Sequence, residues 1–270
     1  MINIVTVMCV AGDPIYFKFA SHSIPSFLRN NIDTDLRVFT DKPDEIKQYL
    51  QLSDKIGIIN IEDYFESHPK EVERFKTKGR TYLPDVVQTH KKDYGYEFHD
   101  MYPAAMPLMA ETMLRGQGYT HILKIDSESY FAGGNMMAMV KKEVEELSIP
   151  EVFLVERKHP AMAHYGGGVP GSGFTLWRIQ SRFVSEYYRN FNGSQQVTIL
   201  AMRFSRRVFI RILKRPGYHF VRPFWKAKET GIEFTKEIAS QFLPAYFHLH
   251  GKIAFEGYEK LEEWFGENSK

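Results

Sequence analysis

The sequence predicts an α/β fold with a mostly parallel central sheet flanked by helices. Short apolar runs rich in β-branched residues recur along the chain, as in strands that are buried on both faces of a parallel sheet. Stretches with helical spacing of apolar residues separate these runs, and such alternation is typical of a doubly wound sheet. The 270 residues, 43% of them hydrophobic, are enough to bury one large core.

The first half of the chain alternates strands and helices. In order, we expect a strand at Ile4–Val10, a helix at Tyr16–Asn30, a strand at Leu36–Asp41, a helix at Pro43–Leu50 and a strand at Ile56–Ile61. Two turn signals, Gly12-Asp13-Pro14 and Asp41-Lys42-Pro43, separate them, and Asp41 is a candidate cap for the second helix. Residues 62–100 are polar, charged and aromatic with weak periodicity, which favours irregular or short helical structure.

The second half continues the same alternation. We expect a helix at Met101–Leu114 that ends at Gly116 and Gly118, a strand at His121–Ile125, a helix at Asn135–Leu147, strands at Val152–Val155 and Phe174–Trp177, a helix at Arg178–Phe191, a late strand or loop at Ala245–Lys252, and an acidic amphipathic helix near Tyr258–Phe265. The chain contains no internal repeat and no low-complexity linker, so one domain over residues 1–270 is expected.

Composition excludes several classes of protein. The single cysteine, Cys9, rules out an intramolecular disulfide and a zinc site built from several cysteines, and it fits a reducing compartment. The N-terminus indicates a first strand because no basic segment precedes its apolar run. No apolar run approaches the roughly 20 residues that span a bilayer. These observations predict a soluble, cytoplasmic protein, and the net charge of +2 favours no particular partner.

The strongest local signal is the buried strand that runs directly into Asp126-Ser127-Glu128. Ligands of open α/β sheets bind beyond the carboxyl ends of strands, and alternation along an extended chain places both carboxylates on one side. Two oxygen ligands suit Mn²⁺ or Mg²⁺, which can bridge the phosphates of a nucleoside diphosphate. The alternative is a structural turn in which Asp126 or Ser127 caps the next helix.

A second signal is His248-Leu249-His250-Gly251-Lys252. On a strand both histidines face the same way, so either one is a candidate third metal ligand. Gly251 permits close approach of the backbone to a phosphate, and Lys252 is a candidate for neutralising phosphate charge. The alternative is a pair of histidines at the surface or the core edge.

A third signal is the glycine-rich run from Gly166 to Gly173, which ends in Gly171-Ser172-Gly173 before a strand. It is not a Walker loop, because no Gly-Lys-Ser/Thr follows, and it is not a dinucleotide fingerprint, because no helix opens there. Backbone passing close to a ligand explains the run, and so does a plain flexible turn.

In this order, the motifs resemble glycosyltransferases of the GT-A fold. Asp126-Ser127-Glu128 is similar to their Asp-x-Asp motif, which binds a divalent metal and the nucleotide diphosphate. His248-Leu249-His250-Gly251 is similar to the His-x-x-Gly of glycogenin-like and lipopolysaccharide galactosyltransferase-like enzymes, although Lys252 follows the glycine immediately here. The stretch from Tyr102 to Phe131 more loosely resembles fungal α-mannosyltransferases.

The resemblance implies a GT-A-like, that is Rossmann-like, domain with a nucleotide-binding half at about 1–130 and an acceptor-binding half at about 131–270. It implies that Thr6, Val7 and Tyr16 line the base pocket, that Gly171 to Gly173 lie near the donor sugar, and that Lys92 approaches the diphosphate. It also implies a hexosyltransferase that moves sugar from a nucleoside diphosphate sugar to a hydroxyl. Candidate general bases for an inverting reaction are Glu156, Glu186 and His164.

Basic residues dominate one segment of the chain, since no acidic residue occurs between Glu186 and Glu229. The block at 203–228 has apolar residues interleaved, and part of it fits an amphipathic helix that contacts an anionic membrane or nucleic acid. The acceptor is accordingly expected to be a saccharide, a lipid-linked molecule or a modified nucleic-acid base. The alternative functions are a nucleotidyltransferase, which the lack of Lys and Arg in residues 9–14 disfavours, and a non-catalytic binding module led by this block.

Overall fold

A computed structural model of the chain describes residues 1–31, 33–48, 50, 55–77, 101–147, 150–156, 170–191, 193, 195–213, 235–249 and 253–266. Its elements are β1 (Ile4–Cys9), α1 (Pro14–Asn30), β2 (Asp35–Thr40), α2 (Pro43–Lys47), β3 (Ile56–Asn60), α3 (Ile61–Ser67), α5 (Met101–Leu114), β4 (His121–Ile125), β5 (Ser129–Ala132), α6 (Met136–Leu147), β6 (Val152–Glu156), β7 (Pro170–Arg178), α7 (Phe183–Asn190), α8 (Gln195–Phe204), β8 (Ile210–Leu213), α10 (Lys236–Ser240), β9 (Ala245–His248) and α11 (Ile253–Phe265). The expected strands and helices are present, with ends shifted by a few residues.

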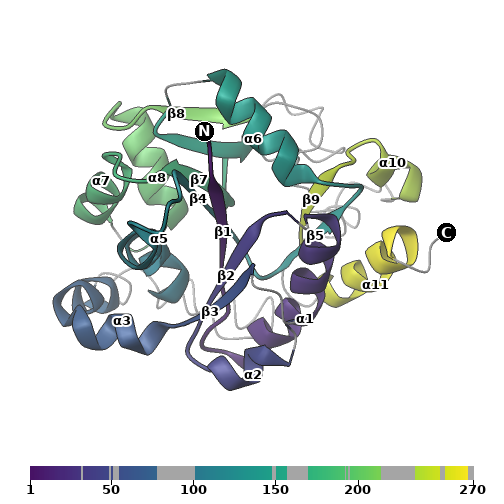
Figure 1. Cartoon of the computed structure of the whole chain (residues 1–270), viewed down its shortest axis with the longest axis horizontal. Coiled ribbons are helices and arrows are strands. Elements are labelled where there is room, and N and C mark those ends of the chain that lie inside the picture. The colour runs from purple at the N-terminus through teal and green to yellow at the C-terminus, as the bar shows by residue number, and fades with distance from the viewer. Residues whose placement is uncertain are drawn as a thin grey trace.

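Seven strands form the central sheet in the order β3-β2-β1-β4-β7-β6-β8 (Figure 1). Strands β3, β2, β1 and β4 are parallel, as are β6 and β8, whereas β7 is antiparallel to β4 and β6. The predicted α/β class with a mostly parallel sheet is thus confirmed. The chain runs outward from β1 to β3 and then returns to place β4 on the other side of β1. This reversal is the switch point at which open α/β sheets bind ligands.

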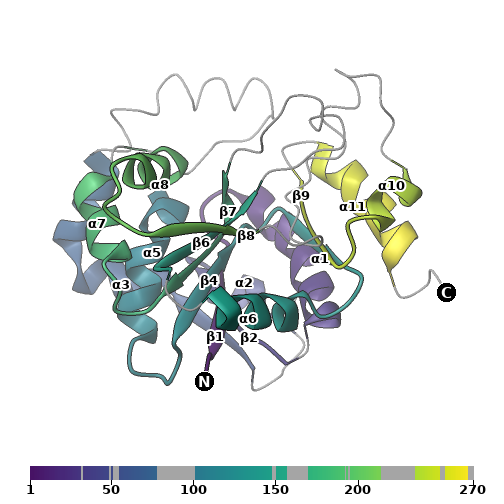
Figure 2. The ribbon, with the colours of Figure 1, turned by 90° about the horizontal axis from the view of Figure 1, so that it is seen from above.

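Helices cover both faces of the sheet, as the two views in Figures 1 and 2 show. On one face α1 and α6 contribute Phe27 and Val140 to a core cluster. On the other face α5 and α7 contribute Met109 and Tyr187 to a second cluster, which α8 also joins. All four side chains are fully buried, and removal of such a side chain from water contributes about 1.5 to 3 kcal/mol. The sheet that positions the site is therefore packed on both sides.

A two-stranded antiparallel ribbon of β5 and β9 forms a separate small sheet. Strand β5 was not predicted from the sequence, because its four residues are all buried and show no alternation. A third core cluster that includes Tyr130 and Tyr258 packs the ribbon against α1 and α11. Arg29 of α1 makes a bidentate ion pair with Glu262 of α11, at 2.9 and 3.0 Å, and the Tyr130 hydroxyl donates to the same carboxylate at 2.7 Å. These contacts fix the ribbon beside the sheet.

One local prediction is wrong, and a second fails over the described residues. Asp41 does not cap α2, since Lys42 occupies the N-cap position. The Asp41 carboxylate instead accepts a hydrogen bond from the Gly12 N–H at 3.1 Å. The basic block is not an amphipathic helix where it is described, because Phe204 ends α8 and residues 210–213 form the edge strand β8. The β-branched Ile210 and Ile212 favour a strand at a sheet edge.

His121, at the amino end of β4, is expected to make stability depend on pH. Its ring lies beside Phe153, and burial, with a smaller effect of Arg178, lowers the pKa of His121 from 6.5 to about 4. The unfolded chain therefore binds a proton at a higher pH than the folded chain, so the stability that neutral His121 contributes is complete above about pH 6.5 and is lost as pH falls toward 4. We expect this group to lower the free energy of unfolding by about 3 kcal/mol across that window.

Thermal unfolding from pH 4 to neutrality, compared between wild type and His121→Phe, measures this contribution. Phenylalanine keeps an aromatic ring beside Phe153 and removes the titrating group, so the variant should show a flatter profile between about pH 4 and 6.5. If the Tm of both proteins changes equally with pH in that window, His121 is not the cause of the pH dependence.

Candidate metal centre

The Asp126-Ser127-Glu128 segment lies at the carboxyl end of β4, at the switch point of the sheet. The Asp126 N–H donates to the Gly173 carbonyl at 3.1 Å, which extends the pairing of β4 with β7 by one residue. Strand β5 begins directly after Glu128, so no helix follows that Asp126 or Ser127 could cap. The alternative of a helix-capping turn is therefore excluded.

The ribbon brings His248 to this segment from 120 residues further along the chain. His248 pairs with Ser129 in the β5–β9 register, and the Leu249 N–H donates to the Glu128 carbonyl at 2.8 Å. The His248 Nε2 atom lies 2.9 Å from Glu128 Oε1 and 3.4 Å from Asp126 Oδ2. One donor atom from each of the three residues falls within 4.8 Å of the other two. We call Asp126, Glu128 and His248 the metal triad.

The three donors fit a divalent cation in both geometry and chemistry. Ligands about 2.1 Å from an octahedral ion are roughly 3 Å apart when adjacent and about 4.2 Å apart when opposite, and the distances within the triad lie close to this range. Two carboxylate oxygens and an imidazole nitrogen form a mixed oxygen and nitrogen donor set that suits a divalent metal ion. Exposure rises from 3% for the His248 side chain to 11% for Glu128 and 23% for Asp126, so the site opens to solvent at Asp126.

Hydroxyl groups hold the backbone of the segment. The Ser129 hydroxyl donates to the Asp126 carbonyl at 2.7 Å, and the Tyr246 hydroxyl donates to the Gly173 carbonyl at 2.9 Å. The Tyr258 hydroxyl donates to the carbonyl of residue 127 at 3.4 Å. Burial, together with the neighbouring carboxylates, raises the pKa of Tyr246 and Tyr258 well above the ordinary value, so both phenols stay protonated and keep donating.

Two residues that were not predicted from the sequence also contact this segment. Lys124 of β4 is 2% exposed, and its ammonium donates to Asp126 Oδ1 and, at 3.1 Å, to the Gln195 side-chain carbonyl. The sequence carries a signal for Lys124, because a lysine two residues before Asp126 in an apolar strand shares its face. It carries none for Gln195, which only the position of α8 brings close. The Gln195 amide nitrogen is buried and has no hydrogen-bond partner among the described residues.

The other predicted site residues divide into three groups. Thr6 and Val7 are fully buried in the two cores on opposite faces of β1, where Thr6 contacts the Met137 sulfur, and the base-pocket role expected for them stays a prediction. Tyr16 lies in the first turn of α1, half-buried, and Gly171 to Gly173 form the start of β7 at the edge that carries the triad. The remaining predicted residues lie outside the described part of the chain: Lys92, His164, His250, Gly251 and Lys252.

Two candidate general bases fall within the described residues. The Glu186 carboxylate pairs with Arg189 on α7 and with Arg207 in the turn after α8, and its role as a general base stays a prediction. Glu156 ends β6 at the same sheet edge as the triad and remains a candidate.

Comparison with solved structures places this architecture among glycosyltransferases. The apo form of mouse xyloside xylosyltransferase 1 superposes with a TM-score of 0.53 at 10% identity, over 92% of this chain and 97% of that one. The glycosyltransferase GlyE of Streptococcus pneumoniae TIGR4 gives a TM-score of 0.53 at 15% identity, over 97% of this chain and 62% of that one. This chain therefore corresponds to about three fifths of the length of GlyE. No protein-family profile matches the sequence, and no curated protein sequence matches it.

The sheet order and these superpositions define the class: the chain has the GT-A-like glycosyltransferase fold, as the sequence motifs predicted. Among known structures of that fold it is similar to the mouse xylosyltransferase along nearly the full length of both chains. None of the helices in the described residues is long and apolar enough to cross a membrane.

Proposed function

We propose that the protein is a metal-dependent glycosyltransferase that moves a sugar from a nucleoside diphosphate sugar to a hydroxyl acceptor. The observation that carries this proposal is the metal triad, which converges at the switch point of a GT-A-like sheet from two segments 120 residues apart. Structural carboxylates seldom converge with a buried imidazole at the edge where such folds bind ligands.

The triad would hold Mn²⁺, or less favourably Mg²⁺, through Asp126, Glu128 and His248. A cation bound there supplies the positive charge that stabilises a departing diphosphate. Lys124 orients the Asp126 carboxylate and offsets part of the negative charge of the segment. The Tyr246 and Ser129 hydroxyls fix the backbone on which the two carboxylates stand. These residues thus preorganise the site, so that little rearrangement is needed when a donor binds.

Asp41 is the residue that we propose to bind the nucleoside of the donor. One of its carboxylate oxygens accepts from the Gly12 N–H, which ties the end of β2 to the turn after β1. The other, Oδ1, is buried and has no hydrogen-bond partner among the described residues. A buried acceptor at the carboxyl edge of the sheet suits an N–H or hydroxyl donor of a base or ribose. Lys252 and Gly251, which follow the ribbon in sequence, stay predictions for diphosphate contact.

A thermal-shift screen tests the proposal on the wild-type chain. Nucleoside diphosphates and nucleotide sugars with hexosyl and pentosyl groups are added with and without Mn²⁺. A ligand at about a hundredfold excess over its dissociation constant stabilises by about 2.7 kcal/mol, which corresponds to roughly 5 to 10 °C in Tm for a domain of this size. We expect at least one diphosphate to give such a shift only with Mn²⁺.

The same screen separates this function from its alternatives. A nucleoside triphosphate that stabilises more strongly than every diphosphate would favour a nucleotidyltransferase. If no nucleotide shifts the wild-type Tm in the presence of Mn²⁺, the transferase proposal fails. Once a donor base is known, release of the diphosphate from its sugar conjugates identifies the sugar, including whether a hexosyl group is preferred.

A further inference from the structure

The turn between α8 and β8 combines exposed arginines with exposed aromatic rings. Phe204 is 80% exposed and Phe209 is 50% exposed, and with the terminal Met1 they are the exposed large hydrophobic residues of the described part of the chain. Four exposed arginines stand beside them, and we call the segment of residues 203–211 the arginine–phenylalanine turn: Arg203, Arg206, Arg207 and Arg211. Exposed apolar groups beside one sign of charge mark an interaction surface.

The backbone of this turn is held firmly. The Arg207 N–H donates to the Met202 carbonyl and the Arg206 N–H to the Arg203 carbonyl, each at 3.2 Å, which is the hydrogen-bond pattern of a Schellman helix end. Val208 is buried in the core on this side of the sheet, and the Phe209 N–H donates to the Glu151 carboxylate at 3.0 Å. The exposure of the two rings is therefore a fixed feature of the turn.

The chain also places an arginine where glycine is preferred. Arg206 has a φ of 55°, in the left-handed region that the residue after a helix end adopts and that glycine occupies at no steric cost. The local fold would thus be more stable with glycine, so the backbone does not explain the arginine. A role for the positive charge of Arg206 explains why arginine occupies this position.

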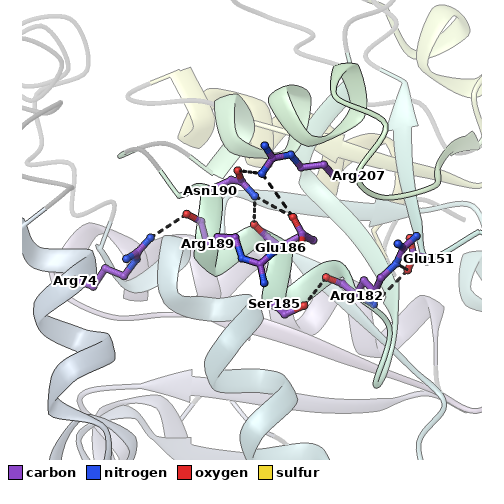
Figure 3. Close-up of polar contacts among 8 residues, drawn as sticks. All are labelled: Arg74, Glu151, Arg182, Ser185, Glu186, Arg189, Asn190 and Arg207. Carbon is purple, nitrogen blue, oxygen red and sulfur yellow. Dashed lines mark hydrogen bonds and ion pairs between the residues drawn. The ribbon is translucent and has the colours of Figure 1, made fainter.

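Acidic side chains near the turn pair with arginines (Figure 3). The acidic side chains are covered, whereas the arginines are more exposed. Glu186 is 14% exposed and pairs with Arg189 at 2.5 Å and Arg207 at 3.8 Å. Glu151 is 17% exposed and pairs with Arg182 at 3.3 Å. The side chains of Arg182 and Arg189 are 73% and 68% exposed. The face next to the turn therefore presents guanidinium groups to solvent, while the carboxylates that pair with them are mostly covered.

We propose that the arginine–phenylalanine turn docks the protein on a membrane surface rich in anionic phospholipid. Guanidinium groups near such a surface are attracted to lipid phosphates, and aromatic rings gain free energy when they enter the interfacial layer. Nucleic acid would satisfy the arginines in the same way, but two exposed phenylalanines on a rigid turn match an interface with an apolar interior better.

The turn lies at the edge of the sheet opposite the metal triad. Ile210 pairs with Val152, the first residue of β6, whereas Asp126 follows the last residue of β4, and β6 and β4 run in the same direction. Strands of five residues separate the two edges by about 15 Å. A chain docked through the turn therefore holds the triad away from the bilayer, which favours an acceptor outside the lipid layer. The proposal that the turn docks on a membrane does not depend on the proposed glycosyltransferase function.

Vesicle sedimentation tests the proposal on the full chain. We expect binding to phosphatidylcholine vesicles that contain phosphatidylserine, weak binding to phosphatidylcholine alone, and a decline with salt. Removing the charges in Arg203→Gln/Arg206→Gly/Arg211→Gln should lower the partition coefficient by about ten- to a hundredfold. Replacing the rings in Phe204→Ser/Phe209→Ser should lower it by about tenfold.

Matched variants separate docking from folding and from catalysis. Loss of three charges on other elements, in Lys47→Gln/Lys142→Gln/Lys236→Gln on α2, α6 and α10, should leave the partition coefficient within about twofold of wild type. Arg206→Gly alone should bind vesicles less while its Tm stays equal to or above wild type. Asp126→Asn should bind vesicles as wild type does, and the turn variants should keep the shift that a diphosphate with Mn²⁺ produces.

Three outcomes would overturn the proposal. The first is binding that does not distinguish phosphatidylserine from phosphatidylcholine. The second is equal loss in the lysine control and the arginine variant, which would indicate net charge alone. The third is a Phe204→Ser/Phe209→Ser variant that binds vesicles like wild type while duplex DNA binding depends on the arginines, which would assign the turn to nucleic acid.

Discussion

Replacement of Asp126 with asparagine is expected to abolish the Mn²⁺-dependent response to nucleoside diphosphates and to lower donor turnover by about a thousandfold or more. Asparagine keeps the shape of the side chain but removes the charge of the most exposed carboxylate in the triad, the one at which the site opens. Loss of one anionic ligand weakens the cation site, and the diphosphate then loses its counter-charge. Thermal shift with Mn²⁺ and the diphosphate identified in the screen measures binding, and diphosphate release from a nucleotide sugar measures turnover.

Asp44→Asn is the matched control for this experiment. Asp44 is an exposed carboxylate on α2 that pairs with Lys47 at 2.6 Å, and such surface pairs contribute little to stability. The control should behave like wild type in both measurements. If Asp126→Asn keeps the full Mn²⁺-dependent shift, the triad is not the metal site.

Replacement of Lys124 with methionine is expected to destabilise the metal-free protein by about 2 to 3 kcal/mol and to make Mn²⁺ more stabilising than it is for wild type. Lys124 is buried and pairs with Asp126, which lies beside Glu128. Without the ammonium, two neighbouring carboxylates share a poorly solvated site, and their repulsion is unrelieved until a cation binds. Chemical denaturation without Mn²⁺ measures the loss of stability, and the same experiment with Mn²⁺ measures the stabilisation by the metal.

The double variant Lys124→Met/Asp126→Asn tests the physical cause of this effect. Removal of both charges leaves neither group unpaired, so the double variant should recover much of the stability that Lys124→Met loses. It should also gain little from Mn²⁺, because one carboxylate of the triad is absent. A double variant that is as unstable as the sum of the two single variants would show that Lys124 acts through packing, with no coupling to Asp126.

Local patterns predicted most elements of the fold correctly, for reasons visible in particular segments. The runs at β1 and β4 are continuous and apolar because both faces of the sheet are covered, and this produces a strong strand signal. Helix α1 begins at Pro14 with Asp13 as its cap, which accepts from the Ile15 N–H at 2.9 Å. Strand β5 was missed, since four buried residues between turns have no period that distinguishes them from a loop.

The structure supplies contacts across the sheet that spacing along the chain does not show. Thr6 and Val7 resemble pocket residues by motif, but they lie in mid-strand, where alternation directs one side chain into each core. Asp41 occupies the right position in sequence for a cap, but it is held by the Gly12 N–H of the neighbouring strand end. Sequence spacing shows which residues are neighbours along the chain. The surroundings of Thr6 and Val7, and the partner of Asp41, depend instead on neighbours across the sheet.

The sequence by itself determined the α/β class, the strand that ends at Asp126 and Glu128, and the shared side of these two carboxylates, because all three follow from periodicity along one segment. The sequence also offered His248 and His250 as candidate ligands, but only the tertiary structure brought His248 to that segment. The tertiary structure also placed Lys124 and Gln195 beside the segment and set the arginine–phenylalanine turn at the opposite edge. These arrangements depend on the β5–β9 register and on the packing of α8, which join residues far apart in sequence. Contacts of that kind are fixed by the packing of the whole core, and no local pattern encodes them.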